Sequence, residues 1–324
     1  MEKREKYSVY TVFIFSFIIL LASPSILMGQ LTISEENRGT LEIHKFDTRS
    51  LSMGSATVSD AYGRVSMGVN PALTGLFNKR ISINSNSNHS WDTNLLRYDA
   101  TLPTLIVGQH HITARIGMLN SGYDEINYLG SAQFPEPDVN QYHADLTYAF
   151  AVTEVFSVGL LQSLSYSFND NAQYLTYFTD FGIAYAPAEN ISYGLVLRGV
   201  GREVEYEIIE TGATTLRSNT IGQKLEIGAT FRFPVEQRRP YMTLSLANEK
   251  RFGEDGLWYK AGLELLPFRF LAVRGGVQFR SVDVIFLPRA GLGFNTDYFR
   301  LDYMVAPRNQ RGENFHQLGL TFQF

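Results

Sequence analysis

From Lys79 onward, hydrophobic and polar residues alternate along the chain with a period of two. In "FRLDYMV" (residues 299–305), every second residue from Phe299 is apolar, and Arg300 and Asp302 fall between them. The segments "LEIGATFRF" and "YHADLTYAF" repeat the pattern. Because side chains on a β-strand project alternately to its two faces, this period predicts strands with one apolar and one polar face.

The alternation, read together with the turn residues that interrupt it, predicts fourteen strands. The expected strands span residues 79–88, 92–102, 110–119, 141–151, 154–167, 173–187, 190–200, 223–234, 240–251, 255–267, 270–282, 284–295, 298–307 and 313–324. Aromatic residues, which make up 13% of the chain, recur near the ends of these strands. That placement is typical of the aromatic girdles at the two surfaces of a membrane.

The connections between the expected strands sort by length. The even-numbered connections are mostly tight, whereas the two longest, residues 120–140 and 201–222, both fall among the odd-numbered ones. Outer-membrane barrels combine an even strand count with short periplasmic turns and long outer loops. A one-sided antiparallel sheet in water also alternates, but it has no reason to sort its loops. The sequence therefore predicts an all-β fold, a transmembrane antiparallel β-barrel of about fourteen strands.

The chain ends on a strand, "HQLGLTFQF", with an aromatic last residue. Closure into a barrel requires the last strand to pair with the first, so that no open edge lies in lipid. In this register the outward-facing residues are His316, Leu318, Leu320, Phe322 and Phe324. Leu320, Phe322 and Phe324 form the expected C-terminal insertion signal. A terminal Phe behind alternating apolar residues resembles the signal read by the barrel-insertion machinery. The alternative is an ordinary C-terminal strand of a soluble sheet.

The N-terminus has the layout of an export signal. A basic start is followed by an apolar run, residues 9–22, and then by small residues up to Gly29. The run is shorter than the roughly 20 residues that a spanning helix needs, which favours a signal peptide over residues 1–29. A retained anchor is the alternative. No second apolar stretch of that length follows, so the exported chain is expected to be periplasmic, secreted or an outer-membrane barrel. The strand pattern favours the barrel, in contact with outer-membrane lipid.

Residues 30–78 do not alternate and are rich in turn-forming glycines. Within them, Asn70 can cap a helix and Pro71 suits its first position. A segment of this size cannot form a stable domain alone, but a fourteen-stranded barrel has a lumen to fill. We therefore expect three parts, a signal peptide (1–29), a hatch or plug inside the lumen (30–78) and the barrel (79–324).

Charged residues occupy many of the positions predicted to face the lumen. They are Asp145, Asp180, Arg232, Lys260, Glu264, Arg274, Arg300 and Asp302. One interpretation is a ring that docks the hatch or lines a polar conduit. The other is that any barrel lumen is polar and pairs its own charges. Arg49 and Asp60 in the hatch are hypothesised to be partners of this ring.

The composition and motifs argue against several functional classes. A net charge of -4 provides no basic surface for nucleic acid, and the absence of cysteine removes thiolate chemistry and disulfides. No G-x-S-x-G, P-loop, H-E-x-x-H or EF-hand motif is present. His110 and His111 are adjacent on a strand and so are poor joint metal ligands. We expect no enzyme activity, metal or cofactor, although a serine–histidine pair using His143 or His316 stays an open alternative.

Two short motifs carry a family resemblance. "RSLSMGSA" (49–56), with Arg49, Met53 and Gly54, is followed by "NPALTGL" (70–76), with Asn70, Pro71 and Ala72. In this order they resemble the N-terminal signature of PorV/PorQ proteins, members of the FadL-like superfamily of outer-membrane barrels. "DFGIAYAP" (180–187) and "RLDYMVAP" (300–307) extend the resemblance. The resemblance implies a hatch inside a fourteen-stranded barrel. This chain has Gly54-Ser55 where relatives carry a glycine pair.

Three functions remain open at this point. The resemblance implies a role in type IX secretion, with secretion subunits or cargo C-terminal domains as partners at the cell surface. The alternative is FadL-like uptake of hydrophobic small molecules such as long-chain fatty acids, and a third is a structural barrel that anchors other surface proteins. The hatch residues Leu51, Met53, Val65, Met67 and Val69 either line an apolar pocket or form the core of the plug.

Overall fold

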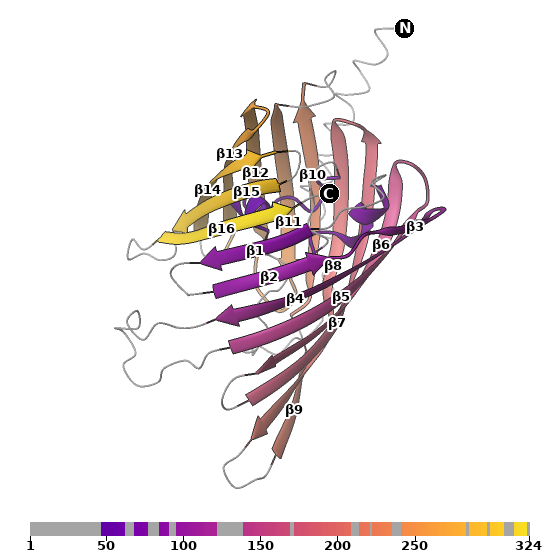
Figure 1. The fold of residues 1–324 in the computed structure, drawn as a ribbon, viewed down its shortest axis with the longest axis vertical. Coiled ribbons are helices and arrows are strands. Elements are labelled where there is room, and N and C mark those ends of the chain that lie inside the picture. The colour runs from indigo at the N-terminus through magenta and orange to yellow at the C-terminus, as the bar shows by residue number, and fades with distance from the viewer. Residues whose placement is uncertain are drawn as a thin grey trace.

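The structure is a computed structural model that describes residues 47–61, 68–76, 84–90, 95–121, 139–168, 172–208, 214–220, 222–234, 241–282, 285–296, 299–307 and 314–322. These residues are almost entirely antiparallel β-structure and include one short α-helix and one 3-10 helix (Figure 1). The expected signal peptide lies outside the described residues. Within the described part of the chain, no helix is long and apolar enough to cross a membrane.

Sixteen strands build one sheet. Their bounds are β1 Asn84–Ser90, β2 Leu95–Thr101, β3 Leu105–Val107, β4 His110–Ser121, β5 Val139–Ala151, β6 Phe156–Phe168, β7 Ala172–Ala188, β8 Ile191–Ile208, β9 Thr214–Thr220, β10 Lys224–Phe233, β11 Met242–Arg251, β12 Trp258–Phe268, β13 Leu271–Arg280, β14 Ile285–Asn295, β15 Phe299–Pro307 and β16 Asn314–Phe322. The helices are α2 Thr48–Ser52 and η3 Pro71–Leu76.

Fourteen of these strands pair in a ring. Strands β10 to β16 follow one another, β16 pairs with β1, and the order continues through β2, β4, β5, β6 and β7 to β8. The main-chain pairing of β8 with β10, over Ile191–Arg198 and Lys224–Phe231, returns to the starting strand. The remaining two, β3 and β9, pair only with β4 and β8 in the described sheet. The fourteen-stranded barrel predicted from the alternation is confirmed.

Polarity across the wall is the reverse of that in a soluble protein. On β5, His143, Asp145 and Thr147 are buried, whereas Tyr142 and Leu146, at the alternate positions, are 53% and 52% exposed. Polar side chains therefore face the inside of the ring and apolar ones face out. This distribution fits hydrocarbon outside and a polar lumen, and it would leave a large apolar surface exposed in water.

Aromatic rings gather on the outer face at both ends of the barrel. At the end with tight turns, Phe268 stacks on Phe270, and Phe294 lies tilted against both Phe270 and Phe299, with ring centroids 5.6–6.1 Å apart. At the opposite end, Tyr142 and Tyr166 both lie against Phe168. These two bands match the interface girdles expected from the sequence.

Two of the expected connections contain strands. Residues 201–222 were expected to form a long loop, but β8 continues to Ile208 and pairs with β9. The alternation in "REVEYEI" already has a strand period, and its charges obscured that signal. This hairpin extends beyond the ring (Figure 1). The expected turn after residue 102 likewise contains β3, which pairs with β4.

The last strand pairs as the closure argument requires. Strand β16 lies between β15 and β1, with Leu320 opposite both Leu301 and Ser87. Gln317 and Thr321 are buried on the inner face, and Leu318 and Leu320 are half-buried on the outer face. Phe322 is the last residue of the strand, and Phe324 lies outside the described residues. A role in insertion stays a prediction.

A charge on the outer face tests the assignment of that face to lipid. Leu263 lies at the middle of β12 and is 37% exposed. We expect Leu263→Arg to lower the free energy of unfolding in lipid vesicles by about 2–4 kcal/mol, because a guanidinium at the bilayer midplane loses its hydration. The measurement is urea unfolding followed by tryptophan fluorescence.

The matched control is Val282→Arg, in the exposed connection after β13. It is expected to change the free energy of unfolding by less than about 0.5 kcal/mol. An equally small effect at Leu263 would mean that this face of β12 does not contact hydrocarbon.

Candidate functional site

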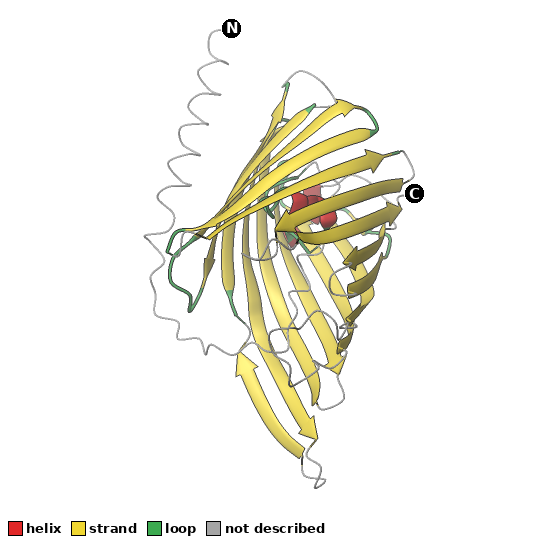
Figure 2. Ribbon diagram, turned by 90° about the vertical axis from the view of Figure 1, so that its left-hand side faces the viewer, coloured by secondary structure: helices red, strands yellow, loops and turns green. Residues whose placement is uncertain are grey.

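The candidate site is the segment that fills the lumen. We call residues 47–61 and 68–76 the hatch segment. It packs against β13, β14, β15 and β16 through α2 and against β4, β5, β6 and β7 through η3. Figure 2 shows both helices enclosed by the strands. Nearly all residues of the segment are buried. It therefore reaches opposite walls of the ring.

Helix α2 begins at an N-cap and ends in a left-handed turn. The Asp47 carboxylate accepts a hydrogen bond from the backbone N–H of Ser50 at 3.3 Å. At the other end, Gly54 and Ser55 have φ angles of 63° and 56°. Left-handed backbone at two consecutive positions favours glycine at both, and here the second is a serine. In this chain Arg289 donates to the Ser55 hydroxyl at 3.2 Å.

The Asn70 side chain ties the hatch segment to the barrel. Its Nδ2 donates to the carbonyl of Val58 at 3.0 Å and to that of Ile183 on β7 at 3.1 Å. Its Oδ1 accepts from the N–H of Ala72 at 3.0 Å, which caps η3. Both ends of the amide are used, and Pro71 has no N–H to satisfy. The Asn-Pro-Ala motif is thus a structural joint between hatch and wall.

Arg49 forms ion pairs in two directions. Its Nε and Nη2 donate to the two carboxylate oxygens of Glu264 on β12, at 3.0 and 2.8 Å. Its Nη1 lies 2.9 Å from Asp60, which pairs in turn with Arg232 on β10 at 2.6 Å. The hypothesis that Arg49 and Asp60 contact the lumen charges agrees with these distances. Arg232 is half-buried, and the other three are buried.

Burial and charge oppose each other at this junction. Burial alone would lower the pKa of the Arg49 guanidinium, but Glu264 and Asp60 outweigh it and hold the pKa well above its ordinary value. Burial would raise the pKa of Asp60, but Arg49 and Arg232 bring it below its ordinary value. Both groups are therefore charged at neutral pH, and each depends on its partners.

The same network returns to the hatch segment along β12 to β15. Arg274 lies 2.6 Å from Glu264 and 2.6 Å from Asp302. Arg300 lies 2.5 Å from Asp302 and 3.3 Å from Asp47, beside α2. Charges of opposite sign alternate throughout, so the predicted lumen charges on these strands are mutually paired and also dock the hatch segment.

A second network holds the other half of the hatch segment. On β8, Arg198 donates to the backbone carbonyls of Gly68 and Val69, and its guanidinium faces Asp180 at 3.4 Å. Arg198 also faces Glu226, which accepts from Lys260 at 2.8 Å. Arg198 was not among the charges predicted from the sequence, although it alternates in phase with Ser192 and Gly194 on the inner face of β8. The register shift between β7 and β8 lies directly after it, and there the Gly199 N–H donates to Asp180 at 2.9 Å.

Asp145 is the one predicted ring residue that joins neither network. It accepts from Arg115 Nε at 2.7 Å and from the Ser163 hydroxyl at 2.6 Å, all within the β4–β6 wall. Next to it, His143 lies 2.8 Å from Asp99. His316 is on the opposite face, with Tyr303. Among the described residues, no group of three His, Asp or Glu side chains is placed to hold a metal.

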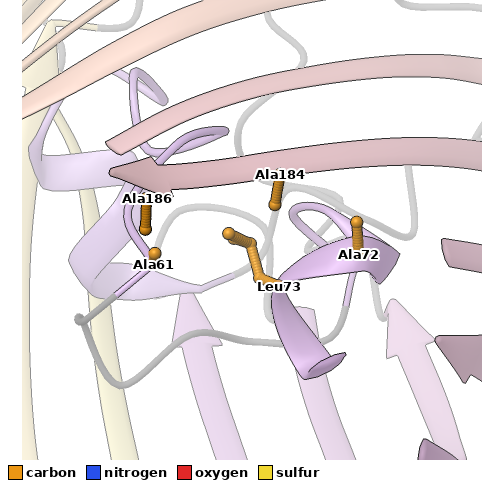
Figure 3. Close-up of a cluster of buried hydrophobic side chains, with 5 residues drawn as sticks. All are labelled: Ala61, Ala72, Leu73, Ala184 and Ala186. Carbon is orange, nitrogen blue, oxygen red and sulfur yellow. The ribbon is translucent and has the colours of Figure 1, made fainter. Parts of the chain in front are cut away.

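The apolar part of the hatch segment is small and tightly packed. Ala61, Ala72 and Leu73 contact Ala184 and Ala186 of β7 (Figure 3). Leu51, Met53 and Val69 are 9%, 0% and 7% exposed. Of the five apolar hatch residues singled out in the sequence, these three are therefore core of the plug, and Val65 and Met67 lie outside the described residues.

Comparisons with known proteins agree with this architecture. No protein-family model and no curated protein sequence matches the chain. Among solved structures, the toluene transporter TodX of Pseudomonas putida matches at 10% identity and TM-score 0.56, covering 85% of this chain and 96% of that one. The toluene transporter TbuX of Ralstonia pickettii matches at 11% and 0.57, covering 88% and 99%. A Pseudomonas aeruginosa FadL homologue matches at 10% and 0.50, covering 84% and 94%.

The chain has the FadL-like barrel fold. The structural likeness shows the fold that the resemblance implied, and it does not show the assignment to PorV/PorQ.

The ion pairs of Arg49 predict a large effect of its removal. We expect Arg49→Gln to lower the free energy of unfolding by about 3–5 kcal/mol, because Glu264 and Asp60 each lose a buried cationic partner. Chemical unfolding in detergent and protease resistance of the hatch segment measure it. Lys250→Gln is the control, since Lys250 donates to two carbonyls of a partly buried turn. Equal losses in the two variants would contradict the prediction.

The lowered pKa of Asp60 predicts how stability depends on pH. A carboxyl whose pKa is lower in the folded than in the unfolded protein stabilises the fold at any pH above its ordinary pKa, here 3.8. This contribution is lost as the pH falls through the pKa of the folded protein. We therefore expect Asp60→Asn to be less stable at neutral pH but to lose less stability below about pH 4. Unfolding curves at pH 7 and pH 3 test this, and parallel losses in the two proteins would contradict it.

Proposed function

We propose that this protein is an outer-membrane channel for the uptake of hydrophobic small molecules. The observation that carries the proposal is the likeness in fold, over nearly the full length, to proteins described as toluene transporters and as a monoaromatic hydrocarbon channel. The apolar outer face and the closed ring of strands support a place in the outer membrane. A signal peptide over residues 1–29 and an insertion signal at the C-terminus belong to the same proposal.

The lumen supports selective passage over general diffusion. A porin keeps a water-filled channel through its whole length. Here the hatch segment contacts opposite walls, and its ion pairs to Glu264 and Arg232 are buried or nearly so. A water-filled pore for hydrophilic solutes is therefore not the function that this arrangement favours. A solute that partitions from water into the apolar surroundings of the barrel is favoured instead.

Type IX secretion is the second candidate, and the motifs at 49–56 and 70–76 are what favour it. Both motifs have structural roles in this chain, because Gly54 and Ser55 end α2 and Asn70 joins the hatch segment to β7. These roles concern how the hatch segment is held in the barrel and do not by themselves point to secretion. The motifs therefore support the superfamily more strongly than the secretion role, for which secretion subunits and cargo C-terminal domains remain expected partners.

Uptake into cells that lack related channels tests the first candidate. We expect cells producing the protein to take up labelled toluene or a long-chain fatty acid faster than cells producing an unrelated porin, whereas a neutral sugar enters at equal rates. The porin control separates selective uptake from leakage. Equal rates for all solutes in both strains would contradict uptake of hydrophobic molecules.

Purification in mild detergent separates the two candidates. Mass spectrometry of the retained material is expected to find a hydrophobic molecule in stoichiometric amount. Secretion subunits, or cargo proteins that share a C-terminal domain, retained without such a molecule would support the secretion role instead.

A further inference from the structure

Seven glycines on the inner wall stand where the hatch segment comes closest to the barrel. They are Gly159 (β6), Gly182 (β7), Gly194 (β8), Gly228 (β10), Gly262 (β12), Gly276 (β13) and Gly291 (β14). A Cβ atom added at each would lie under 3.0 Å from an atom of the hatch segment. We call these seven residues the glycine seat.

The seat is arranged in register across neighbouring strands. Gly159 pairs with Gly182, Gly194 with Gly228, and Gly262 with Gly276. On the remaining strand of this arc, β11, the residue opposite Gly228 is Ala247, which is 1% exposed and packs against Val58. Small residues therefore recur around the wall from β6 to β14 in pairs, and the pairs are offset along the strands, since Gly182 lies opposite Val196 and Gly276 opposite Arg289.

The seat contacts mainly the backbone of the hatch segment. The nearest hatch atoms to an added Cβ are backbone atoms at four positions, the N–H of Ala72, the carbonyls of Val58 and Met53 and the N–H of Gly54. Arg198 reinforces this by donating to two further hatch carbonyls. Glycine weakens a strand interior, so seven glycines in these strands lower the stability of the wall. Close approach of the hatch backbone, which a side chain would block, accounts for their presence.

We infer that the glycine seat is a recognition surface for the main chain of the hatch segment, and that the hatch segment stays on it while the protein works. Close packing over this arc and the ion pairs of Arg49 and Asp60 act on the same segment. Displacement would have to break both at once. Any solute then passes beside a stationary hatch segment, and the hatch segment does not leave the lumen as a plug. The statement that solutes pass a stationary hatch segment rests on the proposed function, whereas the existence of the glycine seat does not.

Two adjacent glycines on β13 give a matched test of the seat. At Gly276 an added Cβ would meet backbone atoms of Gly54 and Met53, whereas at Gly275 it would meet nothing within 4 Å. Since overpacking shifts a local opening equilibrium by about tenfold or more, we expect Gly276→Ala to speed protease cleavage of the hatch segment by that factor. Gly275→Ala is expected to leave the rate unchanged. Both proteins are first checked for a folded barrel by heat-modifiable gel mobility.

Equal cleavage rates in the two folded variants would overturn the seat. If Gly276→Ala does not yield a folded barrel, Gly194→Ala, which would meet the Val58 carbonyl, takes its place in the same comparison. Neither measurement depends on what the protein transports.

A disulfide tests whether the hatch segment stays in place. The Ser59 hydroxyl lies 2.8 Å from that of Thr230 on β10, and the chain has no cysteine of its own. The Ser59→Cys/Thr230→Cys pair is expected to close under mild oxidation and to leave uptake of labelled toluene or fatty acid unchanged. Uptake that is lost on oxidation and restored by reductant would show that the hatch segment must leave β10, and would overturn the inference.

The two tests separate failure of the inference from failure of the proposed function. If the wild-type protein takes up neither solute, the uptake proposal fails, and the cleavage comparison still decides whether the seat exists. In that case the extent of spontaneous closure of the cysteine pair decides whether the hatch segment stays on β10, with slow or incomplete closure counting against it.

Discussion

The backbone must satisfy its own hydrogen bonds in lipid, and the rest of the structure depends on this constraint. An open sheet would leave one edge of N–H and C=O groups without partners, so the chain must return from its last strand to its first. The β16–β1 and β8–β10 pairings complete that return. Closure then fixes which face of every strand is inside, and the inside of a ring this wide has to be filled.

Filling the lumen creates an electrostatic problem that the hatch segment solves. Buried charges are costly unless paired, and removing one partner leaves the other exposed to that cost. Arg49 and Asp60 contribute one charge of each sign and connect β10 with β12. Asp47 of the hatch segment pairs with Arg300 on β15. The lumen charges therefore pair with one another and also hold the hatch segment, because Glu264 contacts both Arg49 and Arg274.

Packing of the hatch segment relies on small residues where a soluble core would use large ones. The apolar cluster at β7 consists of four alanines and one leucine, and the wall from β6 to β14 presents glycines. Where the two backbones lie close together, a side chain of one reaches a carbonyl of the other. Asn70 of the hatch segment donates to Ile183 on β7, and Arg198 on β8 donates to Gly68 of the hatch segment. A hatch held by main-chain contacts and ion pairs fits the proposed channel for hydrophobic solutes better than a water-filled pore for hydrophilic ones.

The sequence by itself determined the fourteen strands of the ring and their inner and outer faces, because alternation is a local property that lipid and lumen impose on every strand. It also located the residues of the charge ring. It did not reveal β3 and β9, which lie outside the ring. Only the tertiary structure decided that Arg49 bridges Glu264 and Asp60, that Arg198 pairs with Asp180 in a second network, and that Asp145 pairs with Arg115. These partners lie up to 215 residues from one another along the chain. Ring closure alone brings them together, and no local pattern encodes the register in which it does so.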